Sequence, residues 1–144
     1  MAIASFSSAA NVREADTVRR ALVDGLINAL AQRDDVRVVE RERIAEALQD
    51  LRMSSEGLID QATALQLGKM TGARVIVTGN LLQIDDELAI TARLINTETS
   101  ELVATRATGS RGNLLAVVDE LAAGVAERLA QDGQRTLARA DDRD

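Results

Sequence analysis

Side chains that could carry bond chemistry are scarce in this sequence. Its 144 residues include no histidine and no cysteine, which removes Cys/His zinc sites, thiol nucleophiles and the histidine general base. Two acidic pairs, Asp34–Asp35 and Asp85–Asp86, have the residue type for acid–base or metal chemistry. Each pair is adjacent in the sequence and lies in a predicted turn without a second cluster of ligands, so turn formation is the favoured interpretation.

Ser7–Ser8 follows an apolar run, as a nucleophile in a tight turn would. Neither a histidine base nor the glycines of a nucleophile elbow accompany it. Lys69 could act as a base only if it were buried, and its neighbours put it on a helix surface. We therefore predict no enzymatic activity, no metal and no cofactor.

The densest charge cluster consists of the consecutive residues Glu40, Arg41, Glu42 and Arg43. We predict that it forms a partner-binding or ring-forming edge at the start of a helix. The alternative is a solvated helix start, where the acids match the helix dipole and the local ion pairs contribute about 0–1 kcal/mol.

A second candidate site combines two strand segments that are distant in the sequence. Phe6 and Ser7 end the first predicted strand, and Gly79 and Asn80 lie within a later one. A small ligand could bind where these strand ends meet. In the alternative, Gly79 marks a β-bulge, which is the more frequent role of a glycine inside a strand.

Composition limits the partners further. Phe6 is the single aromatic residue, so aromatic cages and base-stacking platforms are absent. The net charge of −6 disfavours nucleic acid and anionic membrane surfaces. No apolar run approaches the roughly 18 residues that a membrane-spanning helix needs.

Hydrophobic periodicity predicts a single α/β domain whose core is aliphatic. Apolar residues with the strand period alternate with four-residue stripes such as Leu22, Leu26 and Leu30. We expect a mixed five-stranded sheet covered by about four helices, in the order βαβααβββα. The domain spans residues 1–131, and residues 132–144 form a polar, frayed tail. The expected elements are a strand at 1–6, a helix at 16–32, a strand at 36–39, helices at 40–51 and 60–71, strands at 73–84, 88–94 and 102–108, and a helix from 113.

Four stretches together carry a resemblance: "ALVDGLINALAQ" at 21–32, "VRVVERERIAEALQ" at 36–49, "GLIDQATALQLGKMTGARVIVTGNL" at 57–81 and "LINTETSELVA" at 94–104. They resemble the CsgG family, which includes the curli secretion channel, flagellar accessory lipoproteins and activators of penicillin-binding proteins. The family is related to the amino-terminal domains of TolB. One departure is Ser100, which stands where the family usually has a glycine.

The resemblance implies where this chain differs from the channel members. Those members carry amphipathic membrane hairpins after the central strand and after the last strand. Here the two positions hold only residues 85–87 and 109–113, whereas one membrane-spanning strand needs about 9–11 residues. The chain therefore corresponds to the soluble portion of the family without a membrane span.

The same resemblance implies a function and a location. We expect a non-catalytic envelope module with protein partners in the cell envelope or with itself, in a ring. It would work on the periplasmic side, with a leader or lipid anchor removed, and a cytoplasmic location is the alternative. A ligand-sensing domain that binds a small molecule or a peptidoglycan fragment is the second hypothesis.

Overall fold

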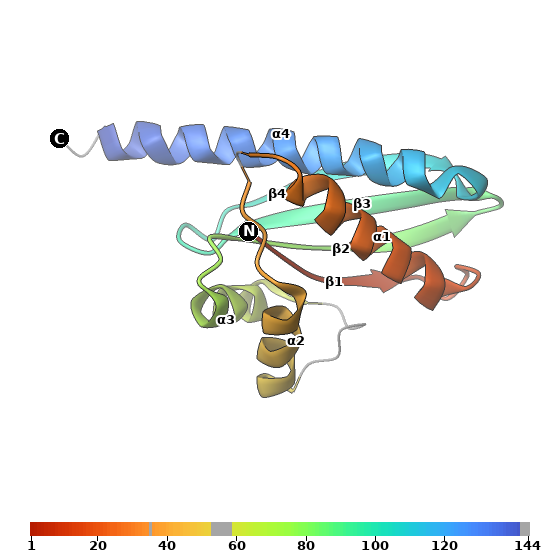
Figure 1. Ribbon diagram of the computed structural model, residues 1–144, viewed down its shortest axis with the longest axis horizontal. Helices are drawn as coiled ribbons and strands as arrows, with labels where there is room; N and C mark the ends of the chain where they lie inside the picture. Colours follow the sequence, from red (N-terminus) through yellow and green to blue (C-terminus); the bar gives the residue numbers. More distant parts are fainter. Residues whose placement is uncertain (35, 53–58, 142–144) are drawn as a thin grey trace.

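The computed structural model describes residues 1–34, 36–52 and 59–141, with side chains up to residue 131. Figure 1 shows one sheet between two layers of helices. The elements are β1 (Ala2–Ser8), α1 (Ala15–Ala31), α2 (Arg41–Asp50), α3 (Gln61–Thr71), β2 (Val75–Ile84), β3 (Glu87–Asn96), β4 (Leu102–Ser110), the short 3₁₀ helix η1 (Arg111–Asn113) and α4 (Leu114–Asp141).

The strands follow one another across the sheet in the order β1-β2-β3-β4. β1 pairs with β2 in parallel, and β2, β3 and β4 form two antiparallel hairpins. Ile84 pairs with Glu87, so Asp85–Asp86 is a two-residue turn, and Asp85 has a φ of 54°. This confirms the turn interpretation of that acidic pair.

The described residues contain four strands, so the prediction of five strands in the order βαβααβββα was wrong, although the mixed α/β class was right. The missing strand was expected at residues 36–39. There the Val39 amide donates to the Met1 carbonyl at 2.8 Å, and the Met1 amino group donates to the Arg37 carbonyl at 2.9 Å. This is one rung of parallel pairing, after which α2 begins at Arg41 and ends the extended run.

The bulge predicted at Gly79 lies instead on the neighbouring strand. Ile3 pairs with Val77 but Phe6 pairs with Gly79, so β1 carries the extra residue. The shift turns the Phe6 side chain towards α1 and α4. A Cβ atom at Gly79 would lie 2.6 Å from Phe6 Cε1 and 2.0 Å from the Thr91 carbonyl oxygen. Gly79 is therefore needed for close packing, and the interpretation as a bulge in β2 was wrong.

Each face of the sheet has its own aliphatic core. On one face α1 and α4 pack against the larger cluster, which includes Leu26, Leu81 and Leu121. On the other face α2 and α3 cover a smaller cluster that includes Leu48 and Ile76. Among the described helices, none has the length and apolar character that crossing a membrane requires.

Local signals in the sequence explain both ends of α3 and one turn between strands. The Asp60 carboxylate accepts the Thr63 amide at 2.8 Å and caps α3, as predicted. Gly72 ends that helix with a φ of 73°, also as predicted. Ser100 has a φ of 65°, a left-handed conformation that favours glycine. The helix α4 runs past residue 131 and ends at Asp141. The domain boundary at residue 131 stays a prediction.

Candidate binding site

The residues of the predicted ligand pocket are neighbours in the sheet, but they do not share one cavity. Phe6 lies opposite Gly79 and Ser7 lies opposite Asn80. The Phe6 ring fills the space above Gly79, while Asn80 faces the other side of the sheet because β2 residues alternate. The Ser7 hydroxyl is 3.5 Å from the Gly79 carbonyl, and Asn80 Oδ1 is buried without a hydrogen bond among the described residues.

The predicted partner-binding cluster divides between the two neighbours of α2. Arg41 forms an ion pair with Asp24 of α1. Arg43 donates a 3.1 Å hydrogen bond to the Thr71 carbonyl, at the end of α3. Glu40 precedes the helix, and both Glu40 and Glu42 are exposed. The two arginines therefore attach α2 to its neighbours through contacts that are distant in the sequence, and the partner-binding role of the cluster stays a prediction.

A groove of about 140 Å³ lies between α1, α2 and β1, and we call it the β1 groove. It brings Phe6, from the predicted ligand pocket, close to Arg41, from the predicted partner cluster. Three arginines line it: Arg19, Arg20 and Arg41. Its apolar lining consists of Ile3, Ala4, Phe6, Val23, Ala45, Ile44 and Leu48.

The arginines of the β1 groove differ in their partners. The Arg19 side chain is only 11% exposed, pairs with Asp16, and reaches the Ser8 hydroxyl at 3.4 Å. Arg41 is half-exposed and pairs with Asp24. Arg20 is exposed and has no ion pair or hydrogen bond with the described side chains. One guanidinium of the groove therefore remains open to an acidic ligand.

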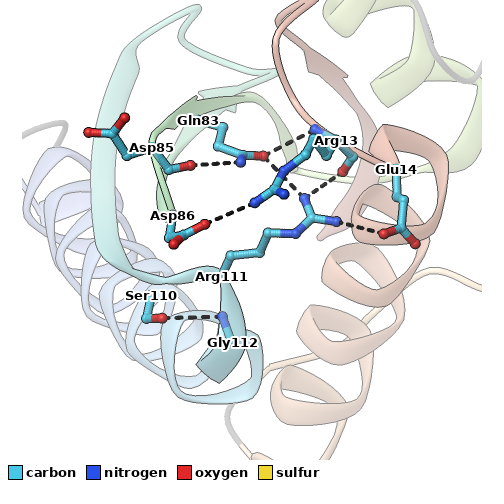
Figure 2. Close-up of polar contacts among 8 residues, drawn as sticks. All are labelled: Arg13, Glu14, Gln83, Asp85, Asp86, Ser110, Arg111 and Gly112. Carbon is cyan, nitrogen blue, oxygen red and sulfur yellow. Dashed lines mark hydrogen bonds and ion pairs between the residues drawn. The ribbon is translucent and has the colours of Figure 1, made fainter.

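A second polar cluster lies where the β2–β3 turn, the residues before α1 and the start of η1 meet, and Figure 2 shows its contacts. We call it the loop-end clasp; it consists of Arg13, Glu14, Gln83, Asp85, Asp86 and Arg111. Gln83 is 5% exposed and lies at its centre. Its Oε1 accepts from the Arg13 amide and from Arg111 Nη1, both at 3.1 Å, and its Nε2 donates to the Asp85 carbonyl at 2.8 Å.

Arg111 connects the three chain links that meet at the clasp (Figure 2). Its side chain also donates to the Arg13 carbonyl and, at 3.3 Å, to Glu14 Oε1. Its amide donates to the Asp86 carbonyl at 2.7 Å. Arg13 in turn pairs with Asp86 at 2.9 Å. The β2–β3 turn and the link between β4 and α4 are thus bonded to each other.

The remaining side chains considered for chemistry lie apart from one another. Asp85 and Asp86 belong to the clasp, Asp34 is exposed, and Asp35 lies outside the described residues. Lys69 is exposed on α3, as predicted. In the described part of the chain, no three acidic side chains gather as a metal site would require.

Sequence reasoning missed Arg19 and Arg20 as groove residues. A signal for Arg19 was present, because it precedes Leu22 by three residues and Leu26 by seven on the buried stripe of α1. Arg111 and Gln83 carried no such signal. They are 28 residues apart and meet only because two hairpin ends close against the start of α1.

Comparisons with known proteins identify a family. The sequence model of the curli production assembly/transport component CsgG matches residues 2–92, which is more than half of the chain. No curated protein sequence matches the chain.

Three solved structures have a similar fold. The LpoB C-terminal domain from Salmonella enterica is 19% identical with a TM-score of 0.55, and the match covers 76% of this chain and 80% of that domain. The LpoB C-terminal domain from Escherichia coli is also 19% identical with a TM-score of 0.58, and the coverages are 75% and 79%. The lipoprotein GNA1162 from Neisseria meningitidis is 12% identical with a TM-score of 0.58, and the coverages are 90% and 94%. At these identities the likeness is one of fold.

Proposed function

The chain belongs to the CsgG family, and from this premise we propose that it is a non-catalytic module of the bacterial envelope that acts by contacting other proteins. We propose the periplasmic side as its location. The process it serves would be secretion, assembly of a surface structure such as curli, or activation of a cell-wall enzyme. A similar fold in a protein described as a lipoprotein supports the envelope location.

The observation that carries this proposal is the composition of the β1 groove. It combines an apolar lining with three arginines, in a chain whose net charge is −6. Arginine beside buried apolar surface is the composition that protein interfaces favour. The groove also joins Phe6 and Arg41, which the sequence had assigned to two separate sites.

Self-association is the second part of the proposal. Glu40 and Glu42 are exposed at the start of α2, beside Arg41 and Arg43, so this edge could meet a complementary edge on another copy. A head-to-tail contact of that kind closes into a ring when the rotation between copies allows it. Size-exclusion chromatography with light scattering tests this part: a defined oligomer supports it, and a monomer at every concentration contradicts it.

Ligand sensing has weaker support from the β1 groove. Sites for small molecules usually enclose about 300–1,000 Å³, which is well above the 140 Å³ of the β1 groove. Of the four residues predicted for a ligand pocket, Phe6 lines this groove, and Ser7, Gly79 and Asn80 do not.

The proposed function is tested by capture and reconstitution. The immobilised domain is incubated with solubilised envelope from the bacterium that encodes it, beside an unrelated α/β domain of similar size and charge. We expect one envelope protein to bind selectively and to form a complex of defined stoichiometry when both proteins are pure. Failure of every captured protein to form such a complex would contradict the proposal, as would turnover of a substrate by the domain alone.

A further inference from the structure

We propose that the β1 groove binds an acidic segment of a partner protein that inserts one large apolar side chain between α1 and α2. This inference rests on the proposed function and specifies the chemistry of the partner. Three observations support it: the size of the groove, the burial of β1, and the distribution of charge around the groove.

The size of the groove matches one large side chain. Its volume is about 140 Å³, and an engineered protein cavity of about 150 Å³ with a similar aliphatic and aromatic lining holds benzene. A leucine or aromatic side chain therefore fits, and a large ligand does not. The lining is supplied by rigid elements, with Phe6 from β1, Val23 from α1 and Leu48 from α2.

Burial of β1 determines how the segment is recognised. β1 is an edge strand, and edge strands often bind partners by adding a strand. Here the residues from Ala2 to Phe6 are each at most 8% exposed, so their backbone offers little surface for such pairing. Recognition must therefore come from a side chain in the groove and from charges on its rim.

The charges on the rim favour acidic flanks on the incoming segment. Arg20 is exposed and has no acidic partner among the described residues, so a carboxylate can bind it without displacing another. Arg41 and its partner Asp24 are 56% and 54% exposed, so an incoming carboxylate competes with Asp24 for Arg41. Guanidinium groups bind carboxylates through two parallel hydrogen bonds.

The probe is a synthetic peptide read by fluorescence. The chain contains no tryptophan and no tyrosine, so the emission of a tryptophan in the peptide reports on the peptide alone. We use a blocked hexapeptide in which one tryptophan is flanked by glutamates, and a matched peptide with lysines in their place. We expect a blue shift and saturable binding for the acidic peptide, and binding at least about tenfold weaker for the basic one.

Variants of exposed residues test the assignment to the groove. Ala45→Phe fills the groove from α2 and should abolish binding, whereas Ala116→Phe places the same ring on an exposed position of α4 and should not. Arg20→Glu should weaken binding about tenfold, and Arg106→Glu on β4 should leave it nearly unchanged. All variants are first compared with the parent protein by circular dichroism and thermal unfolding.

One variant should strengthen binding. Asp24→Asn releases Arg41 from its ion pair, so the acidic peptide should bind about threefold more tightly. Asp119→Asn on α4 removes the same charge elsewhere and provides the control. Equal affinity for both peptides, or an affinity that Ala45→Phe leaves unchanged, would overturn the inference.

Two further probes separate the peptide from other anionic occupants. Octanoate represents a small amphiphile, and phosphatidylglycerol vesicles represent a membrane surface. Binding of either probe with loss in Arg20→Glu, in the absence of peptide binding, overturns the peptide inference and identifies that occupant instead. A reconstituted partner complex that Ala45→Phe does not weaken would leave the proposed function standing and contradict the groove assignment alone.

Discussion

Two regions of this molecule use arginine for opposite purposes. In the loop-end clasp, the Arg111 side chain donates to Gln83, to Glu14 and to the Arg13 carbonyl, and its amide donates to Asp86. In the β1 groove, Arg20 has no such partner among the described residues. Arg111 lies in η1, directly before α4, and Arg20 lies on α1. The helices α1 and α4 cover the same face of the sheet.

The difference shows that the bonds already made by an arginine decide its role. A guanidinium whose donors are already occupied stabilises the fold, because removing it breaks those hydrogen bonds, here including one to the buried Gln83 amide. A guanidinium that is solvated and unpaired contributes little to stability and keeps its donors for a ligand. The clasp and the groove can therefore be separated experimentally, by stability in one case and by binding in the other.

The largest effect is expected from a glycine beside the groove. In Gly79→Ala the new methyl group would meet the Thr91 carbonyl oxygen at 2.0 Å and the Phe6 ring at 2.6 Å. The backbone of β3 cannot move without breaking its ladder, so we expect a loss of about 3 kcal/mol in the free energy of unfolding. Urea unfolding followed by circular dichroism measures it.

The matched glycine lies at the clasp. In Gly112→Ala the nearest atom to the new methyl group is Ser110 Oγ at 3.6 Å, which is an ordinary contact. We expect a change within about 0.5 kcal/mol. Similar losses of stability for both glycines would show that the close packing of Phe6 on Gly79 does not hold Phe6 in its position beside the groove.

The next effect concerns the centre of the clasp. Gln83→Leu removes the acceptor for Arg13 and Arg111 and the donor to Asp85 in a residue that is 5% exposed. We expect a loss of about 2 kcal/mol in the free energy of unfolding. Gln61→Leu removes a single bond to Ser100 at an exposed position and should cost much less. Equal losses would mean that burial of the clasp adds nothing.

The two arginines themselves give the direct test of the comparison. Arg111→Ala should lower the free energy of unfolding by about 1 kcal/mol, because three acceptors lose a donor. Arg20→Ala should change it by less than about 0.5 kcal/mol. A loss in Arg20→Ala as large as in Arg111→Ala would contradict the division into a structural and an available arginine.

The sequence predicted the elements whose local signals agree with their packing. The stripe of Leu22, Leu26 and Leu30 lies in the core of α1, and Asp60 and Gly72 bound α3 as expected. These features depend on residues within one or two turns of the chain. They were readable because periodicity and capping are local properties.

The sequence failed where the outcome depends on distant neighbours. Three valines between residues 36 and 39 have strand propensity, yet they make one rung with Met1 because α2 begins directly afterwards. The bulge was sought at Gly79 and lies in β1, since the glycine permits close packing by Phe6.

The candidate site was predicted in fragments. Phe6 and Arg41 were each singled out, but they were assigned to different sites, because only the meeting of α1 and α2 from opposite faces of the sheet at the β1 edge brings them to one groove. Arg20 was not singled out, since an exposed arginine on a helix has no distinguishing pattern. What makes it notable is that it forms no ion pair among the described residues, because Asp16 and Asp24 are paired with Arg19 and Arg41, and this is a property of the fold.

The smallest effect extends the comparison from donors to acceptors. The Asp60 carboxylate is exposed and holds the Thr63 amide, and this hydrogen bond lowers the pKa of Asp60 below its ordinary value of 3.8. Because the pKa of Asp60 is lower in the folded state, the carboxylate stabilises that state at pH values above its ordinary pKa. This contribution disappears as the pH falls through the pKa of the folded state.

The variant Asp60→Asn keeps a side-chain acceptor for the Thr63 amide but cannot titrate. The parent protein should therefore be slightly more stable than the variant at about pH 6, and the difference in Tm should shrink towards about pH 3. A difference that does not change with pH would show that the cap acts through its hydrogen bond alone, so that a single exposed bond carries no measurable charge effect.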